Sequence, residues 1–198
     1  RRLRSAPSPA TDSPSSQTEA GSGTGQHVVY FAGRTPDITW WPSDLHAAHL
    51  RSIAAWRVHA GLANIRPPQP IDLSDPAWSP APSDGKGPDK LLAIFCANVI
   101  HIAPWRVAEG LFAGAARHLR ADGRLFLYGP FKRGGKHTAL SNAVFDTSLR
   151  ERDAEWGVRD IADVETRLAA ELLRAARAAA RAAAAASSIS RPVVKRSA

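Results

Sequence analysis

Apolar positions along the chain predict strands that alternate with helices. Residues 91–98 form a continuous apolar run of strand length, which is typical of a parallel strand covered on both faces. Residues 104–119 carry apolar side chains at the spacing of one helical face, and residues 124–128 form a second apolar run. A strand, a helix and a strand in this order predict a βαβ unit with a parallel pair of strands.

The preceding part of the chain shows the same alternation. Short strands are expected at 38–42, where Pro42 would end the strand, and at 64–71. Helices are expected at 27–32 and at 45–60, the second closed by Gly61. Together these elements indicate an α/β domain with a mainly parallel sheet.

Other segments read as connections or as ends of the domain. Residues 74–90 are rich in Pro, Gly, Ser and Asp and predict a surface loop, and Ala121-Asp-Gly123 predicts a turn. Residues 163–186 are rich in Ala and Arg and predict a long helix. We therefore expect a disordered segment at 1–18, a single domain at 19–165, and a helix with a disordered tail at 166–198.

The net charge of +8 lies mostly at the two ends of the chain. Residues 1–18 carry three Arg and one Asp, and residues 165–198 carry seven Lys or Arg and two Glu. Nucleic-acid-binding domains usually have a basic face on their folded part, so this distribution argues against nucleic acid as the partner. The alternative is a nucleic-acid-binding protein that uses the basic C-terminal helix, and its affinity for nucleic acid would fall steeply with salt concentration.

The single cysteine and the length of the apolar runs bear on the compartment. Cys96 lies inside an apolar strand and is expected to be a small buried side chain; one cysteine allows no intramolecular disulfide. No apolar run approaches the roughly 18 residues of a transmembrane helix. We expect a cytoplasmic location, with organelle targeting by the Arg- and Ser-rich residues 1–18 as the alternative.

A glycine-rich turn is the first candidate for chemistry. Glu19 precedes Gly21, Gly23 and Gly25 in the spacing acid-x-Gly-x-Gly-x-Gly, directly before the first expected helix. The third position of a dinucleotide-binding fingerprint is occupied by Gln26, so that fingerprint fails. The spacing suits a ligand without a pyrophosphate, such as S-adenosylmethionine with its sulfonium and amino-acid groups. A flexible linker is the alternative interpretation of a Gly/Ser-rich stretch.

Polar residues follow three of the expected strands. Asp44 could accept hydrogen bonds from both hydroxyls of a ribose, or it could cap the following helix. Asp72 could meet an adenine amino group, or it could serve only as a turn residue. Asn98 offers both a donor and an acceptor to a ligand. In a parallel sheet these strand ends meet at one edge, together with the glycine turn.

Candidates for acid–base chemistry follow later in the chain. His101, His137 and Tyr128 could act on a substrate, although each could equally be structural. The basic segment 129–136 could bind an anion or close over a site, or it could be a solvated loop. The Cys and His spacings match no zinc site, so we expect no metal.

Several stretches resemble an uncharacterised methyltransferase-like family, the one that includes methyltransferase-like protein 26. The stretches that carry the resemblance are Gly-Ser-Gly-Thr-Gly-Gln-His27, Ile-Thr-Trp-Trp-Pro-Ser-Asp44, and residues 94–105, 109–114, 127–132, 141–146 and 152–160. The resemblance implies a Rossmann-like seven-strand methyltransferase fold. It also implies S-adenosylmethionine as the cofactor, with contacts from Glu19, Gly21, Gly23, Gly25, Asp44, Asp72 and Asn98.

The chain departs from this family at both ends. The polar stretch 13–18 stands where the family has an apolar first strand, and the Ala/Arg-rich run replaces the last strand pair. We therefore expect an incomplete fold in which these strands are degenerate or missing. The function we expect is an S-adenosylmethionine-dependent methyltransferase-like protein whose acceptor, a small molecule or a protein, is undetermined. The alternative is a non-catalytic binding or interaction protein.

Overall fold

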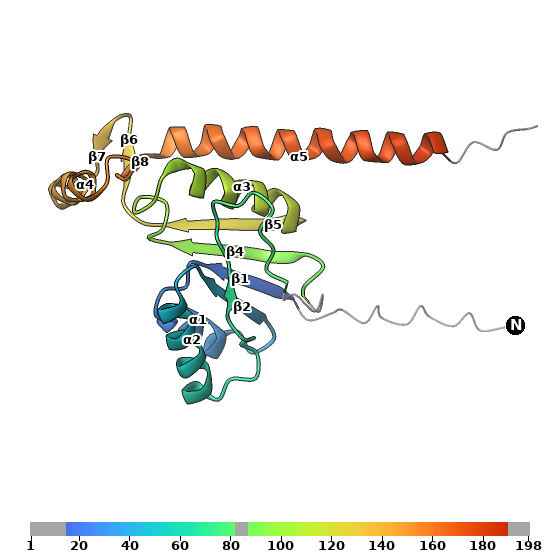
Figure 1. Cartoon of the computed structure of the whole chain (residues 1–198), viewed down its shortest axis with the longest axis horizontal. Helices are drawn as coiled ribbons and strands as arrows, with labels where there is room; N and C mark the ends of the chain where they lie inside the picture. The colour runs from blue at the N-terminus through green and yellow to red at the C-terminus, as the bar shows by residue number, and fades with distance from the viewer. Residues whose placement is uncertain (1–14, 82–86, 190–198) are drawn as a thin grey trace, which may run out of the picture. The chain divides into compact units, whose positions relative to one another are not determined.

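The computed structural model of the protein describes residues 15–81 and 87–189, and its larger sheet has five strands (Figure 1). The strands are β1 (Ser16–Ala20), β2 (Thr39–Asp44), β3 (Gln69–Pro70), β4 (Leu91–Ala97) and β5 (Leu119–Tyr128). Their order is β3-β2-β1-β4-β5, and every pairing is parallel. The expectation of an α/β fold with a parallel sheet is confirmed. The strand order reverses between β1 and β4, which is where open α/β sheets bind ligands.

The described residues divide into two units. The first contains the residues up to Asp72 together with 79–97 and 118–128, and thus holds the whole larger sheet. The second contains 73–78, 98–117 and the residues from Gly129 onward. The tail residues 1–14 and 190–198, on which part of the expected disorder falls, lie outside the described residues.

The first strand is present, contrary to the expectation that it would be degenerate or missing. β1 lies in the middle of the sheet, with Gln17 paired to Trp40 on one side and to Ala93 on the other. Two partner strands satisfy its backbone groups on both edges, and the buried Thr18 hydroxyl donates to the carbonyl of Trp41. A polar strand is tolerated here because its neighbours, rather than its own side chains, supply the apolar cover.

The sequence analysis expected the second strand to end at Pro42. This expectation is wrong, because β2 continues through Pro42 to Asp44. Trp40 exchanges its backbone hydrogen bonds with the 64–66 segment, and the Asp44 carbonyl accepts from Ile71. Alternate residues of a strand point their backbone groups to the same edge, so Pro42 faces that edge too. The β3 strand pairs only with Ser43 and Asp44, and the missing N–H of proline therefore removes no ladder bond.

The turn expected at 121–123 and the strand expected at 64–71 differ from the observed structure. The turn expected at 121–123 lies inside β5, where the pairing shifts between Leu91↔Leu119 and Ala93↔Arg124 and the extra residues bulge out of the ladder. The strand expected at 64–71 is reduced to β3 and a single bridge at Ile65, because consecutive prolines interrupt it.

Two helices of the first unit form its core with β2. They are α1 (Gln26–Arg34) and α2 (Ala47–Ala60). The apolar cluster consists of Val28, Ala32, Trp40, Ile53 and Ile65, all buried. Gly61 ends α2 in the left-handed conformation, as the sequence predicts. This packing fixes the loop between β1 and α1 relative to the end of β2.

The second unit contains three helices and a small sheet. They are α3 (Trp105–His118), α4 (Leu140–Arg152) and α5 (Ile161–Ile189), and the sheet order is β7-β6-β8. Its strands are β6 (Phe131–Arg133), β7 (Lys136–His137) and β8 (Arg159–Asp160). The basic segment 129–136, expected as a loop, thus forms a hairpin with β6 antiparallel to β7. In the chain, the small sheet and α5 follow β5, and α5 occupies the region in which the last strand pair of the family was expected to be missing.

A buried carboxylate joins the hairpin to α4. Asp146 Oδ2 lies 2.6 Å from Lys132 Nζ and 3.2 Å from His137 Nε2, while Oδ1 accepts the N–H of Val158 at 2.7 Å and lies 3.3 Å from Arg150 Nε. The pKa of Asp146 is lowered because these donors outweigh the effect of burial. The carboxylate therefore holds three segments of the second unit together.

An aromatic ring between two cations fixes the start of α5. The Trp105 ring has the guanidinium of Arg159 at 4.7 Å and that of Arg167 at 4.3 Å from its centroid. Arg159 also donates to the carbonyls of Ile100 and Ala103. The long helix expected at 163–186 is confirmed. None of the described helices has the length and hydropathy needed to cross a bilayer.

Candidate functional site

The glycine loop between β1 and α1 is tied to the end of β2. The Gly23 N–H donates to Asp44 Oδ2 at 2.9 Å, and the Ser22 N–H donates to the Ser43 carbonyl at 2.7 Å. The loop residues Gly21, Gly23 and Gly25 all have positive φ, at 74°, 56° and 92°. The linker interpretation of this stretch is therefore wrong, because hydrogen bonds hold the loop in one conformation.

Two of these glycines have different requirements. A Cβ at Gly25 would stand 3.0 Å from the Cα of Ile53, so glycine is needed for the close packing of α1 on α2. A Cβ at Gly23 would meet nothing within 4 Å. Gly23 therefore presents its backbone to open space, as a loop that a ligand approaches closely would do.

Glu19 is a buried carboxylate at the end of β1. Only 1% of its surface is exposed, and neither carboxylate oxygen has a hydrogen-bond partner in the described structure. The hydroxyl of Ser22, which could reach it, donates instead to the Glu19 backbone carbonyl. The nearest imidazole is that of His27, whose Nδ1 lies 3.4 Å from Glu19 Oε1. An unpaired buried carboxylate is costly, so this group indicates a binding function.

Burial dominates the electrostatics of this carboxyl. The pKa of Glu19 is raised from 4.5 to about 8, chiefly by burial and also by the nearby charge of Asp44. The Ser22 side chain and the Val28 amide lower it only in part, since neither makes a well-formed bond to the carboxylate. A cation placed beside Glu19 would favour its charged form and relieve this penalty.

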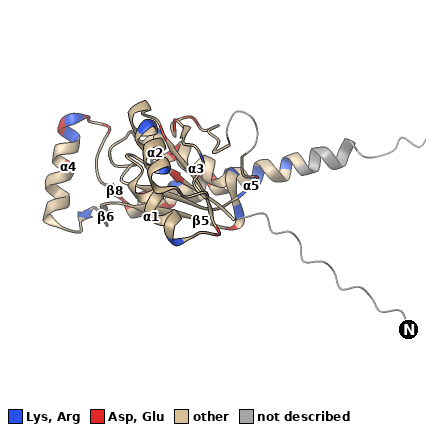
Figure 2. Cartoon of the chain, turned by 90° about the horizontal axis from the view of Figure 1, so that it is seen from below, with Lys and Arg blue, Asp and Glu red and all other residues tan. Residues whose placement is uncertain are grey.

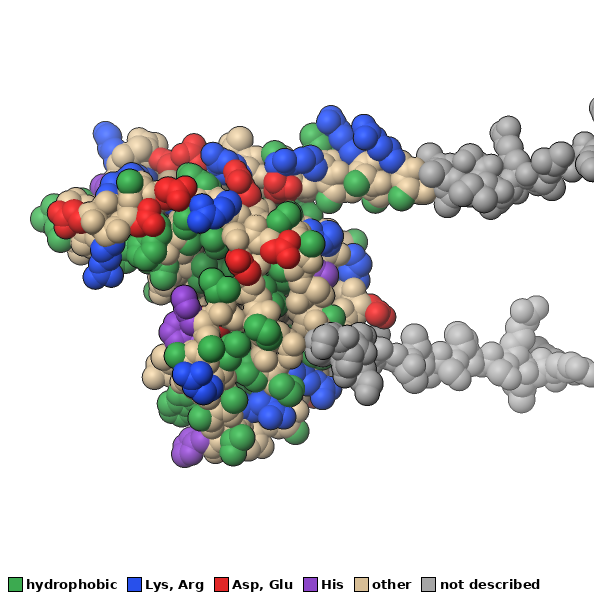
Figure 3. Space-filling view, in the orientation of Figure 1, with side chains coloured by type: hydrophobic (Ala, Val, Ile, Leu, Met, Phe, Trp, Pro, Cys, Tyr) green, Lys and Arg blue, Asp and Glu red, His purple; other side chains and the backbone are tan. Residues whose placement is uncertain are grey.

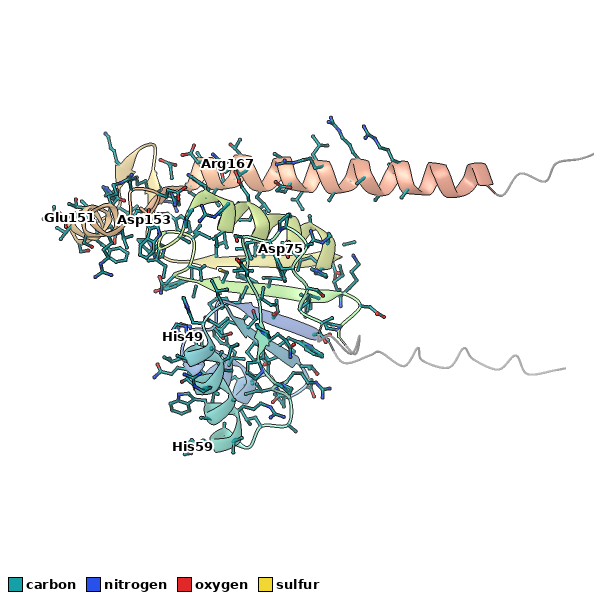
Figure 4. The ribbon with its side chains drawn as sticks, viewed as in Figure 1. His49, His59, Asp75, Glu151, Asp153 and Arg167 are labelled. Atoms are coloured by element: carbon teal, nitrogen blue, oxygen red, sulfur yellow. The ribbon has the colours of Figure 1, made fainter. Side chains whose placement is uncertain are left out.

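Asp44 is also buried, but its carboxylate is well satisfied. Oδ2 accepts from Gly23, while Oδ1 accepts the His46 N–H at 2.9 Å and lies 3.0 Å from His49 Nδ1. The helix cap of α2 is His46, so Asp44 is not the N-cap that the alternative interpretation required. About three of the four acceptor positions of the carboxylate are used, and a ribose diol would have to replace one of these partners. His49 lies at the N-terminal end of α2, opposite His59 (Figure 4).

The remaining expected cofactor contacts follow β3 and β4. Asp72 is exposed and comes two residues after β3, next to Ile71, which donates to the Asp44 carbonyl at 3.2 Å. Asn98 directly follows β4, is exposed and has φ 57°, the left-handed conformation that asparagine tolerates. Glu19, the glycine loop and Asp44 are thus brought together within the first unit, while Asn98 belongs to the second.

The three acid–base candidates have different surroundings. His101 is buried, and its pKa is lowered to about 4, first by burial and then by the charge of Arg159. His137 Nε2 lies 3.2 Å from Asp146 Oδ2, a carboxylate oxygen that can only accept, and His137 Nδ1 is buried with no partner in the described structure. Tyr128 is 66% exposed at the end of β5. Cys96 is buried as expected, and burial raises the pKa of its thiol to about 12. No group of metal-ligating side chains occurs among the described residues.

Two histidines that contact these carboxylates were missed in the sequence. His27 is the second residue of α1, and His49 is in the first turn of α2. The available signal was position, because each histidine lies in the first turn of a helix that follows a candidate acid. Side chains there point back toward the preceding loop.

The described basic residues of the second unit lie on several elements. Lys and Arg residues occur on α4, in the β6 region and on α5 (Figure 2). Along α5, acidic and basic side chains are intermixed (Figure 3), and two of its arginines pair with Glu109 and Glu171. The expectation that nucleic acid is not the partner stays a prediction.

Comparison with known proteins places this chain in a family and a fold. A family model described as "Protein of unknown function (DUF938)" matches residues 9–186. An O-methyltransferase family 2 protein from Planctomyces limnophilus, solved with apigenin, is 17% identical with a TM-score of 0.66, and the match covers 84% of this chain and 47% of that one. The YcgJ protein of Bacillus subtilis is 17% identical with a TM-score of 0.59, and 79% and 61% of the two chains are covered.

A third similar structure was solved with a nucleoside ligand. PKMT2 from Rickettsia typhi, in complex with AdoHcy, is 16% identical with a TM-score of 0.52, and the match covers 70% of this chain and 24% of that one. The chain spans less than two thirds of the length of each of these structures. At these identities the likeness shows the fold, an α/β fold of the methyltransferase type.

Proposed function

The chain belongs to the DUF938 family of proteins of unknown function, and we propose that it binds S-adenosylmethionine and acts as a methyltransferase-like protein. The observation that carries the proposal is the unpaired, buried carboxylate of Glu19 beside the glycine loop. S-adenosylmethionine carries an ammonium group that would donate hydrogen bonds to this carboxylate. The AdoHcy bound to a protein of similar fold supports the same choice of ligand.

The residues of the first unit fit such a ligand. Glu19 would accept from the ammonium, and the open backbone of Gly23 would allow the ligand to approach the loop. Asp44 would accept hydrogen bonds from the ribose hydroxyls after one of its present hydrogen-bond partners is displaced. His49 is the easiest of these to displace, because it is half-exposed. Gly21 and Gly25 would shape the loop, with Asp72 and Asn98 as the further contacts expected from the sequence, Asp72 toward the adenine.

In the proposed reaction the main contribution of the protein is to position the cofactor and the acceptor. When bound, the cofactor supplies a methyl group on an already activated sulfonium, and the protein would orient the acceptor in line with it and exclude water. An acceptor that must lose a proton would need a base. His101 is a neutral imidazole over most of the pH range, and it, His137 and Tyr128 are the candidates.

The finer assignments rest on the sequence. We propose that the chain is related to the methyltransferase-like family that includes methyltransferase-like protein 26, on stretches such as Gly-Ser-Gly-Thr-Gly-Gln-His27. The acceptor is a small molecule or a protein, and the location we propose is the cytoplasm.

Calorimetric titration with S-adenosylmethionine and S-adenosylhomocysteine tests the proposal. We expect saturable binding by the wild-type chain and a loss of about tenfold or more in Glu19→Gln, which removes the charge but keeps the shape. The matched control is Glu151→Gln, an exposed glutamate on α4 (Figure 4). Failure of the folded wild-type chain to bind either ligand would refute the proposal. Binding without methyl transfer to any acceptor would identify the non-catalytic alternative.

A further inference from the structure

The long helix α5 is packed in its first half and bare in its second. In the first half Val164 is buried, and the guanidinium of Arg167 lies over the ring of Trp105. From Ala176 to Ala182 every residue is exposed, and this stretch makes about two turns of the helix. No side of these two turns is therefore covered by another part of the chain that the structure describes.

The bare half of α5 is unusual in composition. Residues 172–186 consist only of Leu, Ala and Arg. Ala and Arg are strong helix formers, so the helix does not depend on packing in this region. Leu172 and Leu173 are 47% and 52% exposed. The uncovered surface is therefore apolar except for its arginines, which is typical of a surface that binds a partner.

The arginines of this half form one stripe. Arg174, Arg177 and Arg181 follow one another at intervals of three and four residues, which places them on one side of the helix. Arg174 pairs with Glu171, the last acidic residue of α5, whereas Arg177 and Arg181 form no ion pair with another described residue. Residues 172–198 carry six Lys or Arg and no Asp or Glu. The stripe thus lacks counter-charges beyond Glu171, and blue side chains are visible there beside the grey residues (Figure 3).

An apolar helix surface with an arginine stripe fits the interface of an anionic membrane. Such a helix lies in the plane of the membrane, with its apolar side chains at the boundary between headgroups and acyl chains and its cations among the phosphates. A nucleic acid would attract the same charges, but it would leave the exposed leucines and alanines without cover. The Ser, Thr, Asn and Gln side chains that help to bind nucleic-acid phosphates are absent from residues 172–186. The composition therefore favours a lipid surface.

We propose that the half of α5 beyond Glu171 docks the protein on anionic phospholipid, with Arg177 and Arg181 among the headgroups and the neighbouring leucines and alanines against the acyl chains. Anionic lipids are found in the cytoplasmic leaflet, which agrees with the location proposed above. The inference does not depend on the proposed cofactor site, because Glu19, the glycine loop and Asp44 belong to the first unit and α5 to the second.

Vesicle flotation with the full chain tests the docking. We expect binding to phosphatidylcholine vesicles that contain about 30% phosphatidylserine and none to phosphatidylcholine alone. Most of the binding should be lost at about 1 M salt, which screens charges beyond about 3 Å. The double variant Arg177→Gln, Arg181→Gln should bind about 10- to 30-fold more weakly, because each Lys or Arg near the surface contributes about fivefold. Glutamine has nearly the helix propensity of arginine, and circular dichroism checks that the helix persists.

The matched control removes the same charge elsewhere. Arg133→Gln, Arg152→Gln changes two exposed arginines outside α5 and should bind within about twofold of the wild type. Equal losses in the two double variants, or equal binding to both kinds of vesicle, would overturn the proposal. A folded chain that binds neither kind would overturn it too. Binding to duplex DNA but not to anionic vesicles would overturn it in favour of nucleic acid.

A label on α5 tests the apolar contact separately. Ala180 lies two turns after Leu173 on the same side of the helix. The native thiol of Cys96 is buried, so a polarity-sensitive dye would react with the cysteine introduced by Ala180→Cys. Its fluorescence should rise with anionic vesicles, whereas the same dye on Glu151→Cys of α4 should not respond. Vesicle binding without a rise at position 180 would overturn the assigned contact with the acyl chains.

Discussion

Replacing Glu19 by glutamine should make the protein more stable at neutral pH. Its carboxyl is buried without a hydrogen-bond partner, and its pKa is raised from 4.5 to about 8. In the unfolded chain the carboxyl ionises above pH 4.5, whereas in the folded chain it stays protonated until about pH 8. Stability is therefore fully present below pH 4.5 and is lost as the pH rises toward 8. Glutamine is neutral and of the same shape, so the variant does not suffer this loss.

The size of the effect follows from the pH. Each pH unit between 4.5 and 8 costs the folded state about 1.4 kcal/mol, because the folded carboxyl retains a proton that the unfolded one releases. At pH 7 the loss amounts to about 3 kcal/mol, and at pH 4 it vanishes. The Glu19→Gln variant should therefore exceed the wild type in free energy of unfolding by about 3 kcal/mol at pH 7.

Urea denaturation followed by tryptophan fluorescence measures this difference, since Trp40 and Trp41 are buried in the neighbouring strand β2. The unfolding free energies of wild type, Glu19→Gln and the surface control Glu151→Gln are compared at pH 4, 5.5 and 7. A difference between Glu19→Gln and wild type that does not grow with pH would refute the reasoning. So would a variant that is less stable at pH 7, since that would mean that the carboxylate is satisfied in the folded protein.

Three further predictions follow from the site and the second unit. Calorimetry should find that S-adenosylhomocysteine binds about tenfold more weakly for each pH unit below 7, because the ligand's ammonium requires an ionised Glu19, whose pKa is about 8. The affinity of Glu19→Gln should show no such change below pH 7. In urea unfolding, Gly25→Ala should cost about 2 kcal/mol or more because its Cβ meets Ile53, whereas Gly23→Ala should cost about 1 kcal/mol, and equal losses would contradict the packing argument. Asp146→Asn should destabilise the protein by about 3 kcal/mol at pH 7; because the pKa of Asp146 is lowered, the difference should shrink as the pH falls below about 4, and a difference independent of pH would rule out a role for its charge.

The parts of the fold that the sequence predicted are those with strong local patterns. The apolar run of β4 and the apolar face of α3 can be recognised from the residue types alone, because in both elements apolar residues occupy the buried positions. The glycine loop and Asp44 were also identified, because positive φ and a strand-end acid have clear residue preferences. The geometry that brings Asp44 to Gly23 could be expected from the meeting of parallel strand ends at one edge.

The parts that were missed depend on neighbours far along the chain. Nothing local in Ser16–Ala20 indicates a central strand, because its stability comes from β2 and β4. Pro42 is tolerated only because the facing segment leaves its edge unpaired. The bulge in β5 likewise depends on the register with β4. The contact between His27 and Glu19 forms only in the folded chain, so the sequence does not show it.

The position of β1 also constrains the order of events during synthesis. This strand leaves the ribosome before the others, yet Gln17 pairs with Ala93, and a polar strand cannot gain stability from collapse on its own. β1 can pair with β2 early, but it gains its second neighbour only after β4 has emerged, and until then the edge it later shares with β4 is open to other pairings. Pulsed hydrogen exchange during refolding should find the β1 amides protected no earlier than those of β4.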